Sequence, residues 1–553
     1  MSIIIASVLF RWFIFEFPVS FIGGDPDRYA IWSNIILQTG HLTEIPNSFY
    51  QNAPNGILLP ALVSMITGVH LRDGFGIYAL LIGVMVPFLS ISFAHRIQNK
   101  QPDLMIGAAV MGSTLAVVVK ISYLPIPQNL GTLLFQVFIL FLLIYHRKPS
   151  RENQLGIIIV IVALAFTHKL HLFLILCVFA IYILYKYIRS TIWIHFPSFE
   201  SHTKVVLATI NILVLVVWFS VAFNFTPLIF TILGSSFGIG LIYVLTSDLD
   251  FTPNIRSQDL NMNLTTLTFF FILVFCLWIF QWAFQTTFLK SFFRFYAIPI
   301  LSGGSPPITT FSHATQSSKG ALRIFYHQTH NLILLLGTTI ISTWMFMTNR
   351  DKAIPVLSAI ALLLFLSPMS ILVKSMPGIG ATRLVPNFAA LIAAILSIGF
   401  INSIDKNINA KMVAIAAFVI LLVFQTGSFV MVPDYPGAHR SYLQQDEVDA
   451  KEFVYRYTSG EITTDYWYAD ESISPLPNQY TDSNTIFERN SLGYLNKTLF
   501  NQNHKYILLR TSIKVYRFNV AGFWELNWKP SMVPTPKYNT VYDNGGEELL
   551  VKK

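Results

Sequence analysis

Residues 75–94 read FGIYALLIGVMVPFLSISFA and contain no charged side chain. A helix needs about 20 mainly apolar residues to cross the hydrocarbon core of a bilayer. Charges flank this run, with Arg72 and Asp73 before it and Arg96 and Lys100 after it. We therefore expect residues 75–94 to form a membrane-spanning helix.

Similar apolar runs recur along most of the chain. Of its 553 residues, 54% are hydrophobic and 12% are charged, whereas roughly 25% are charged in a soluble domain. The mean hydropathy is +0.56. We predict an all-α polytopic membrane protein with about thirteen spanning helices, at residues 3–22, 75–94, 104–120, 130–145, 155–167, 171–187, 205–223, 227–246, 263–286, 331–349, 354–374, 384–403 and 412–432.

The basic residues are concentrated among these runs. Residues 433–553 hold only 13 of the 37 Lys and Arg residues but 15 of the 28 Asp and Glu residues. A basic excess between apolar runs is typical of short cytoplasmic loops and does not indicate nucleic-acid binding. The loops after 75–94, 130–145 and 171–187 are basic, so we expect them inside and the segment 23–73 outside.

Two domains are predicted from this pattern. Residues 1–432 form the membrane domain, with a first outer loop at 23–73 and a long outer loop at 287–330. The apolar run 57–69 is too short to span and suits an interfacial helix. Residues 433–553 form a small extracytoplasmic α/β domain, with a helix over 441–457, a strand over 506–510 and a hairpin turn at 542–545.

Neither cysteine indicates a disulfide or a metal site, because Cys177 and Cys276 both fall within apolar runs. The first apolar run contains Arg11 and Glu16 and is not followed by a cleavage site of small residues, so no cleavable signal peptide is expected.

Charged side chains follow the first apolar run directly, in Gly24-Asp25-Pro26-Asp27-Arg28-Tyr29-Ala30. A carboxylate at a membrane–water boundary can take a proton from an acceptor hydroxyl. The alternative is that Asp25 and Asp27 are the cap and first-turn acids of a helix over 27–39.

Donor groups gather at a second outer turn, Phe166-Thr167-His168-Lys169-Leu170-His171. A leaving phosphate needs cationic or hydrogen-bonding partners of this kind. Snorkelling or helix capping is the alternative interpretation for His168, Lys169 and His171.

The order of these motifs resembles the GT-C glycosyltransferase superfamily. An acid after the first span, followed by two interfacial helices, is similar to that plan. The stretch 25–30 looks like the Asp-Glu-x-Arg-Tyr-Ala of the lipid A aminoarabinose transferases, and 50–56 fits the start of the second interfacial helix. The resemblance implies that Asp25 is the catalytic acid, with Asp27 as helper or cap.

The resemblance also implies a donor. Enzymes of this group take sugars from polyprenyl-linked carriers, dolichyl phosphate among them, and Arg28, His168, Lys169, His171 and Arg383 would bind the donor phosphate. For Arg383, an interfacial anchor is the alternative. The expected reaction is inverting transfer of a single hexosyl or pentosyl group to a glycan, lipid or protein acceptor at the outer face of the cell membrane.

Two features of the superfamily are missing. The loop 123–129 holds no second acid, so no metal or other cofactor is expected, although a divalent metal stays an alternative. The Trp-Trp-Asp-Tyr-Gly motif of oligosaccharyltransferases is absent, and residues 465–468 echo it only in part. We therefore exclude transfer of a whole oligosaccharide to asparagine.

A transporter or flippase of a lipid-linked sugar or similar anion would share these basic groups. It would more often contain broken helices in matching positions of two halves, and the sequence has no such pair. A membrane scaffold without catalytic activity is a third possibility.

Overall fold

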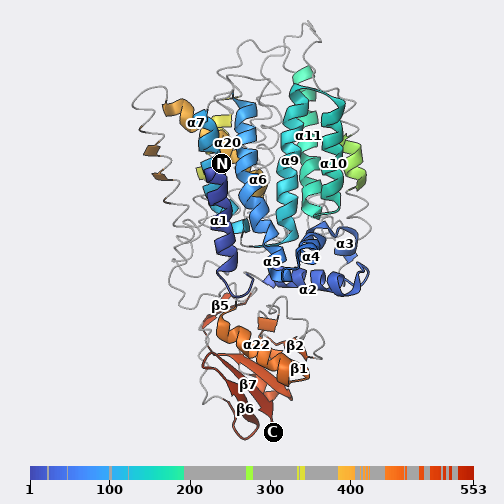
Figure 1. Ribbon diagram of the computed structural model, residues 1–553, viewed down its shortest axis with the longest axis vertical. Coiled ribbons are helices and arrows are strands. Elements are labelled where there is room, and N and C mark those ends of the chain that lie inside the picture. Colours follow the sequence, from blue (N-terminus) through green and yellow to red (C-terminus); the bar gives the residue numbers. More distant parts are fainter. Residues whose placement is uncertain are drawn as a thin grey trace, which may run out of the picture. The chain divides into compact units, whose positions relative to one another are not determined.

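A computed structural model of the chain describes the helices of the first 191 residues and most of the C-terminal sheet (Figure 1). The described residues are 1–21, 24–45, 48–98, 102–122, 124–191, 270–277, 384–404, 443–465, 485–490, 498–511 and 533–553, with short pieces within 333–345, 412–423, 468–469, 515–518 and 522–525. The chain divides into two compact units. One contains residues 1–7, 82–119 and 128–429, and the other contains 8–81, 120–127 and 430–553.

Apolar α-helices make up the N-terminal third of the chain. In chain order they are α1 (Ser2–Glu16), α6 (Ile77–Ile97), α7 (Pro102–Thr114), α8 (Ala116–Ser122), α9 (Pro127–Arg147), α10 (Arg151–Ala165) and α11 (Lys169–Thr191), with four further helices between α1 and α6. A short 3-10 turn, η5 (Val385–Phe388), leads into α20 (Ala389–Ile404). The predicted mostly helical fold, with several apolar helices, is confirmed.

Three helices of the described part are long and apolar enough to cross a membrane: Leu71–Ile97, Pro127–Arg147 and Val385–Asn402. A fourth span is possible if α7 and α8 count as one, although they meet at an angle of 53°. The predicted runs 205–223, 227–246 and 354–374 and the loop 287–330 lie outside the described residues, so the figure of about thirteen spans stays a prediction.

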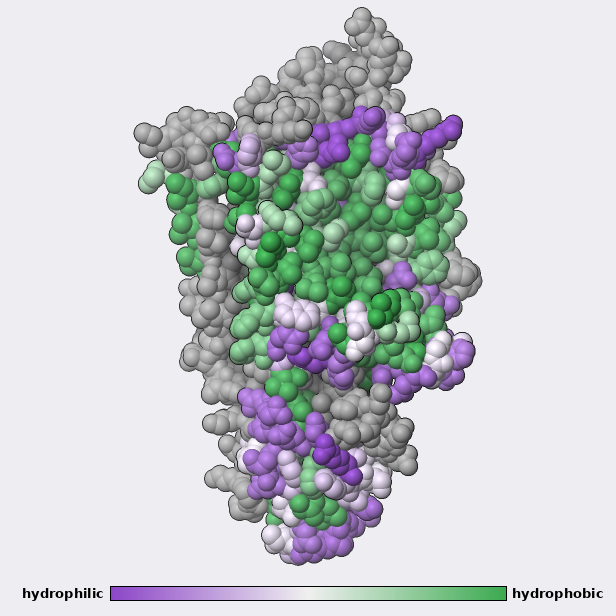
Figure 2. Space-filling view, viewed as in Figure 1, coloured by the Kyte–Doolittle hydropathy of each residue, from purple (hydrophilic) through white to green (hydrophobic). Residues whose placement is uncertain are grey.

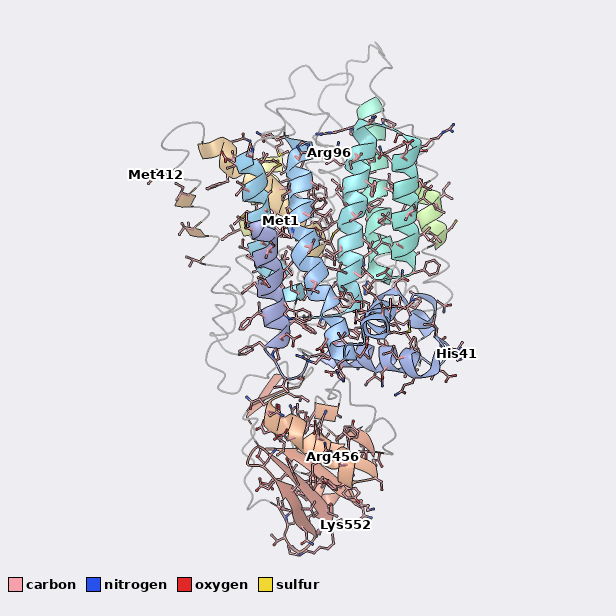
Figure 3. All side chains as sticks on the ribbon, viewed as in Figure 1. Met1, His41, Arg96, Met412, Arg456 and Lys552 are labelled. Atoms are coloured by element: carbon pink, nitrogen blue, oxygen red, sulfur yellow. The ribbon has the colours of Figure 1, made fainter. Side chains whose placement is uncertain are left out.

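The helical unit has an apolar side and a polar rim. Figure 2 shows hydrophobic residues covering the sides of the helices and hydrophilic residues gathered where the helices end. Arg96, labelled in Figure 3, is in the last turn of α6, and Arg147 is the last residue of α9. Basic residues at helix ends are typical of membrane proteins.

Four helices form the segment that follows α1. They are α2 (Gly24–Thr39), α3 (Ser48–Asn52), α4 (Asn55–Thr67) and α5 (Leu71–Phe75). Their common core joins Trp32 of α2, Tyr50 of α3 and Ile57 of α4. The hydroxyl of Ser33 donates to the carbonyl of Ile57 at 2.7 Å, which fixes α4 against α2. The short helix predicted at 57–69 is confirmed as the 13-residue α4.

Pro127 approaches the backbone of Gly56 so closely that position 56 has no room for a side chain. A Cβ added to Gly56 would lie 2.2 Å from Cβ of Pro127, the first residue of α9. The carbonyl of Gly56 also accepts a hydrogen bond from the hydroxyl of Tyr78. Only a residue without a side chain allows this contact.

Two arginines anchor α1. Arg11 is completely buried, and its Nε donates to Oγ of Ser122 in α8 at 3.0 Å. Arg72 of α5 pairs with Glu16 at 3.1 Å and donates to the carbonyl of Pro18 at 2.7 Å. The C-terminal half of the apolar helix therefore has polar partners inside the protein.

The C-terminal part is a five-stranded mixed sheet packed against one helix. The strand order is β2-β1-β3-β7-β6, for β1 (Gly460–Thr464), β2 (Thr485–Arg489), β3 (Tyr506–Arg510), β6 (Tyr538–Asp543) and β7 (Glu547–Lys552). β1 runs parallel to β2 and β3, whereas β7 is antiparallel to β3 and β6. A separate hairpin joins β4 (Val515–Phe518) and β5 (Gly522–Glu525).

The helix on this sheet, α22 (Gln445–Tyr457), begins with a capping box between Gln444 and Glu447. It buries Val448 and Val454 against strand residues such as Leu508. Arg456, labelled in Figure 3, is in its last turn, where a cation is favoured by the helix dipole. The predicted α/β fold, the strand over 506–510 and the hairpin at 542–545 are all confirmed.

A buried ion pair joins this helix to the sheet. Arg510 donates to both carboxylate oxygens of Asp465, each at 2.8 Å, and Glu447 lies 3.4 Å from the same guanidinium. The backbone N–H of Tyr468 also donates to Asp465, at 3.0 Å. Asp465, the acid in the partial echo of the oligosaccharyltransferase motif, thus has a structural partner.

We predict that Asp465→Asn destabilises the C-terminal sheet. Removing one member of a buried pair leaves the other charge uncompensated and costs about 3–5 kcal/mol. Glu452→Gln is the matched control, because Glu452 and Arg456 form an exposed pair on α22, which is worth about 0.3–0.5 kcal/mol. Thermal unfolding of the full chain, followed by near-UV circular dichroism, measures both. Equal stability of the two variants would contradict the assignment.

Candidate functional site

The predicted acids lie in the first turn of α2. Asp25 is the second residue of this helix, and Asp27 follows two positions later. The side chain of Asp27 is buried, at 1% exposure, whereas Arg28 is exposed. The structure does not describe the side chain of Asp25. The helix predicted over 27–39 is confirmed, and it begins at Gly24, so both acids lie in its first turn, as the capping interpretation expects.

The charge of Asp27 affects the pKa of a tyrosine in the C-terminal part. Burial, and then the negative charge of Asp27, raise the pKa of Tyr455 in α22 above its ordinary value. The ring of Tyr455 packs edge-on against Phe487, with centroids 5.4 Å apart. A buried hydrogen bond joins the same two parts of the chain, from the N–H of Leu443 to Oγ of Ser20 at 2.8 Å. The C-terminal part therefore contacts the segment that carries the acids.

The aromatic residues next to the acids are also fixed. The hydroxyls of Tyr29 and Tyr50 are 3.1 Å apart, and both rings contact Trp32, with centroids 5.4 Å and 5.2 Å from it. Arg28 and Tyr29 therefore belong to α2, a helix that is packed through Trp32 against Tyr50 of α3.

His168 and His171 lie together at the start of α11. Their ring centroids are 5.1 Å apart. Nδ1 of His168 accepts a hydrogen bond from the N–H of Leu170 at 3.3 Å, so His168 caps this helix. His171 is completely buried. Lys169 is the first residue of α11, and its side chain is among those not described.

His171 is joined to a residue that sequence reasoning missed. Its Nε2 lies 2.8 Å from Oδ1 of Asn387, in η5. An amide oxygen only accepts, so His171 carries its proton on Nε2. The same oxygen accepts from the hydroxyl of Thr132 in α9, at 2.8 Å. Asn387 thus connects α9, α11 and η5.

Gln136 is the second residue that was missed. Its amide nitrogen donates to the carbonyl of Pro386 at 3.1 Å, and its amide oxygen accepts from the N–H of Ala390 at 3.0 Å. Thr132 and Gln136 are four residues apart, so both face the same side of α9. Uncharged polar residues at this spacing in an apolar helix were the signal that could have revealed them.

Gly131 leaves room for the His171 ring. A Cβ at this position would lie 2.4 Å from Nδ1 and 2.5 Å from Cε1 of His171. Nδ1 of His171 has no hydrogen-bond partner in the described part of the chain. The ring is therefore held by close packing on one side and by Asn387 on the other.

Arg383 lies outside the described residues, immediately before the helical segment that contains Asn387. The structure thus brings together His168, His171 and the segment following Arg383. Asp27 and Arg28 belong to the other compact unit. The roles predicted for these residues remain predictions.

No metal-binding cluster is evident in the part of the chain that the structure describes. No group of three or more His, Cys, Asp and Glu side chains there could hold an ion. Asp25, whose side chain is not described, is not covered by this statement.

No protein-family description and no curated protein sequence matches this chain. Several solved structures are similar to the chain. An oligosaccharyltransferase from Archaeoglobus fulgidus, solved with Zn and sulfate, matches with 11% identity and a TM-score of 0.47, over 100% of this chain and 73% of that one. The arabinofuranosyltransferase AftD from mycobacteria matches with 14% identity and a TM-score of 0.45, over 100% of this chain and 39% of that one.

ArnT from Cupriavidus metallidurans, solved with undecaprenyl phosphate, matches with 13% identity and a TM-score of 0.41, over 99% of this chain and 97% of that one. These similar structures are GT-C glycosyltransferases, the group that the sequence resembles. With such low identities and TM-scores below 0.5, the similarities concern the general arrangement of the chain and carry no activity with them.

We predict that Gly131→Ala destabilises the helical unit. The added methyl group displaces the His171 ring from Asn387, and overpacking of this kind costs about 1–3 kcal/mol. Gly107→Ala is the control, because its new Cβ would meet Ser397 at an ordinary 3.6 Å. Thermal unfolding in detergent should show a lower midpoint for Gly131→Ala alone. A wild-type midpoint for Gly131→Ala would show that the ring is not confined there.

We also predict that Asp27→Asn lowers the pKa of Tyr455. A nearby negative charge disfavours the phenolate, so its removal makes ionisation easier, while burial keeps the pKa above the ordinary value. NMR titration of protein with ¹³C-labelled tyrosine measures the change, and the spectrum of Tyr455→Phe assigns the signal. An unchanged titration in Asp27→Asn would contradict the proximity of these two residues.

Proposed function

We propose that the chain is a membrane glycosyltransferase. It moves a single sugar from a polyprenyl-phosphate-linked donor to a hydroxyl of a glycan, lipid or protein at the outer face of the cell membrane. The observation that supports the proposal is that the bond between His171 and Asn387, 216 residues apart in sequence, brings His168 at the start of α11 close to a segment that follows Arg383 by a few residues. Donor groups gathered at the ends of apolar helices suit a lipid-linked phosphate.

Asp25 is the proposed general base. Its carboxylate takes the proton of the acceptor hydroxyl while the hydroxyl oxygen attacks the anomeric carbon of the sugar. The bond between that carbon and the phosphate oxygen breaks, and the phosphate leaves with the bonding electrons. One displacement inverts the anomeric centre. Asp27, being buried, supports Asp25 or the helix start rather than touching the acceptor.

Arg28, His168, Lys169 and Arg383 are the proposed partners of the donor phosphate. As the glycosidic bond breaks, positive charge develops on the sugar and negative charge on the phosphate. Fixed cations and N–H donors stabilise that negative charge. His171, predicted to bind the phosphate, is assigned an indirect role, because its Nε2 already donates to Asn387. Metal-free transfer is part of the proposal.

The C-terminal part is proposed to lie outside and to help bind the acceptor. Its supporting observation is the contact between Leu443 and Ser20, which places it against the segment with the acids.

A transporter of a lipid-linked anion is the second candidate. The specific observation in its favour is the break at Leu115, where α7 and α8 meet at 53°. Transporters usually have such breaks in matching positions of two halves.

The test is sugar transfer from a radiolabelled polyprenyl-phosphate donor in membranes of the source cells. Asp25→Asn should lower the rate by about 10²-fold or more, as expected for loss of a general base. Glu44→Gln, which changes an exposed acid of the same segment, should leave the rate unchanged. A metal chelator should also have no effect.

Full activity of Asp25→Asn would remove this residue as the base. If folded wild-type protein transfers no sugar but moves the labelled donor across vesicles, the transporter assignment replaces the enzymatic one.

A further inference from the structure

Two arginines of different helices lie close together at one end of the helical unit. Arg96 is in the last turn of α6, and Arg147 is the last residue of α9. Their guanidinium groups are near enough for the two positive charges to repel each other. Figure 3 shows Arg96 where α6 ends, and Figure 2 shows a band of hydrophilic residues at this end of the helices. Because like charges brought together cost free energy, such a pair indicates a negative partner.

One edge of the Arg147 guanidinium has no partner. Its Nε and Nη2 atoms are buried, and neither forms a hydrogen bond in the described part of the chain. The residue as a whole is only half-buried, so this edge lies just beneath the surface. The N–H groups of Nε and Nη2 form a fork that binds two oxygens of one phosphate or carboxylate. Since charged donors are costly to leave unsatisfied, an oxyanion at this edge would stabilise both at once.

Neither arginine forms an ion pair with an acid among the residues that the structure describes. Glu152, the acid nearest in sequence to the end of α9, interacts instead with Ser150 and Lys148. Asp103, the acid nearest in sequence to the end of α6, is in the first turn of α7 and is exposed. The positive charge at this end is therefore not balanced by these acids.

Hydrogen bonds to neighbouring helices fix both helix ends. The side-chain amides of Gln98, just after α6, and Asn402 of α20 exchange two hydrogen bonds, at 2.9 and 3.0 Å. Nε2 of Gln154 in α10 donates to the hydroxyl of Tyr145 in α9 at 2.5 Å. The backbones that carry the two arginines are thus held in place, and their repulsion persists unless an anion enters.

An exposed apolar stripe runs along the next helix, α10. Leu155, Ile159 and Val162 follow Arg151 at spacings of four, four and three residues, so they share one face of the helix. They are 57%, 58% and 40% exposed. A free phosphate would leave this stripe uncovered, whereas a phospholipid bound by its headgroup would place an acyl chain against it.

We propose that the ends of α6 and α9 bind the phosphate of an anionic phospholipid. Nε and Nη2 of Arg147 donate to two phosphate oxygens, Arg96 supplies a second positive charge, and an acyl chain lies along α10. Basic pockets between membrane helices bind phospholipid headgroups in this way.

This site is separate from the candidate functional site. Arg147 is 15 residues further along α9 than Thr132, which bonds to Asn387. That separation corresponds to about 22 Å of helix. The inference therefore does not depend on sugar transfer.

The test titrates the delipidated full-length chain, in a neutral detergent, with phosphatidylglycerol and measures bound lipid by native mass spectrometry. Arg147→Gln should weaken the apparent Kd about tenfold, equivalent to about 1.4 kcal/mol. Arg147→Lys keeps the charge but lacks the fork, so it should weaken binding by an intermediate factor. Arg456→Gln is the matched control, because it removes an exposed arginine from the last turn of α22, and it should leave the Kd unchanged.

A stability measurement separates lipid binding from a structural role. Without lipid, Arg147→Gln should be at least as stable as the wild type, because it removes the repulsion with Arg96. Phosphatidylglycerol should raise the thermal midpoint of the wild type, since a ligand stabilises the state that binds it, and should not raise that of Arg147→Gln. A variant that is less stable without lipid and still shows the full rise with lipid would overturn the site.

Two further probes distinguish the sources of the phosphate. Phosphatidylcholine, which has no net charge, should bind more weakly than phosphatidylglycerol, and sodium phosphate alone should not stabilise the chain to the same extent. Equal binding of sodium phosphate, in competition with phosphatidylglycerol, would overturn the assignment to a lipid. Unchanged binding of phosphatidylglycerol by Arg147→Gln would overturn the site itself.

Discussion

The hydrogen bonds that end on Asn387 illustrate the constraint on which this structure depends. A polar atom buried among apolar helices has no water to bond, so it must find its partner inside the protein. Thr132 and His171 meet this requirement together at one amide oxygen. Arg11 meets it through Ser122. These partners come from distant parts of the chain, and each pair decides how two helices face one another.

The same constraint shapes the C-terminal sheet. Arg510 is 2% exposed, yet it is bound by both oxygens of Asp465 and approached by Glu447. The helix and the strands therefore share a fixed charge cluster rather than an entirely apolar interface. Such a pair is stable only when every member is present. This cluster belongs to the same part of the chain as Leu443, which bonds to Ser20, and Tyr455, whose pKa is affected by Asp27.

The sequence predicted the features that depend on neighbouring residues. The charge-free run 75–94 is contained in the span Leu71–Ile97, and the strand Tyr506–Arg510 has the predicted bounds. The hairpin at Gly545 follows from a glycine with a positive φ of 88°. In each case hydrophobic period, length or turn chemistry acts within a few residues, so one stretch of sequence contains the whole signal.

Features that depend on distant partners could not be predicted in this way. The hydrogen bonds of Gln136 to Pro386 and of Thr132 to Asn387 could not be predicted, because the partners lie about 250 residues apart in sequence. The run 104–120 read as one helix, yet it breaks at Leu115. His171 was predicted to bind the donor phosphate, and this stays a prediction, but its bond to Asn387, 216 residues away, was not predicted. Tertiary contacts decide such cases, and a single sequence does not record them.

The central proposal is that the chain binds a lipid-linked sugar, with Asp25 as the base and His168 next to the donor phosphate. Photolabelling with a polyprenyl-phosphate sugar that carries a photoreactive group on the sugar or next to the phosphate tests it most directly. The account predicts that mass spectrometry finds label in peptides from residues 24–30 or from residues 166–171, and that unlabelled donor prevents it. Competable label confined to other parts of the chain, in folded protein, would contradict the account.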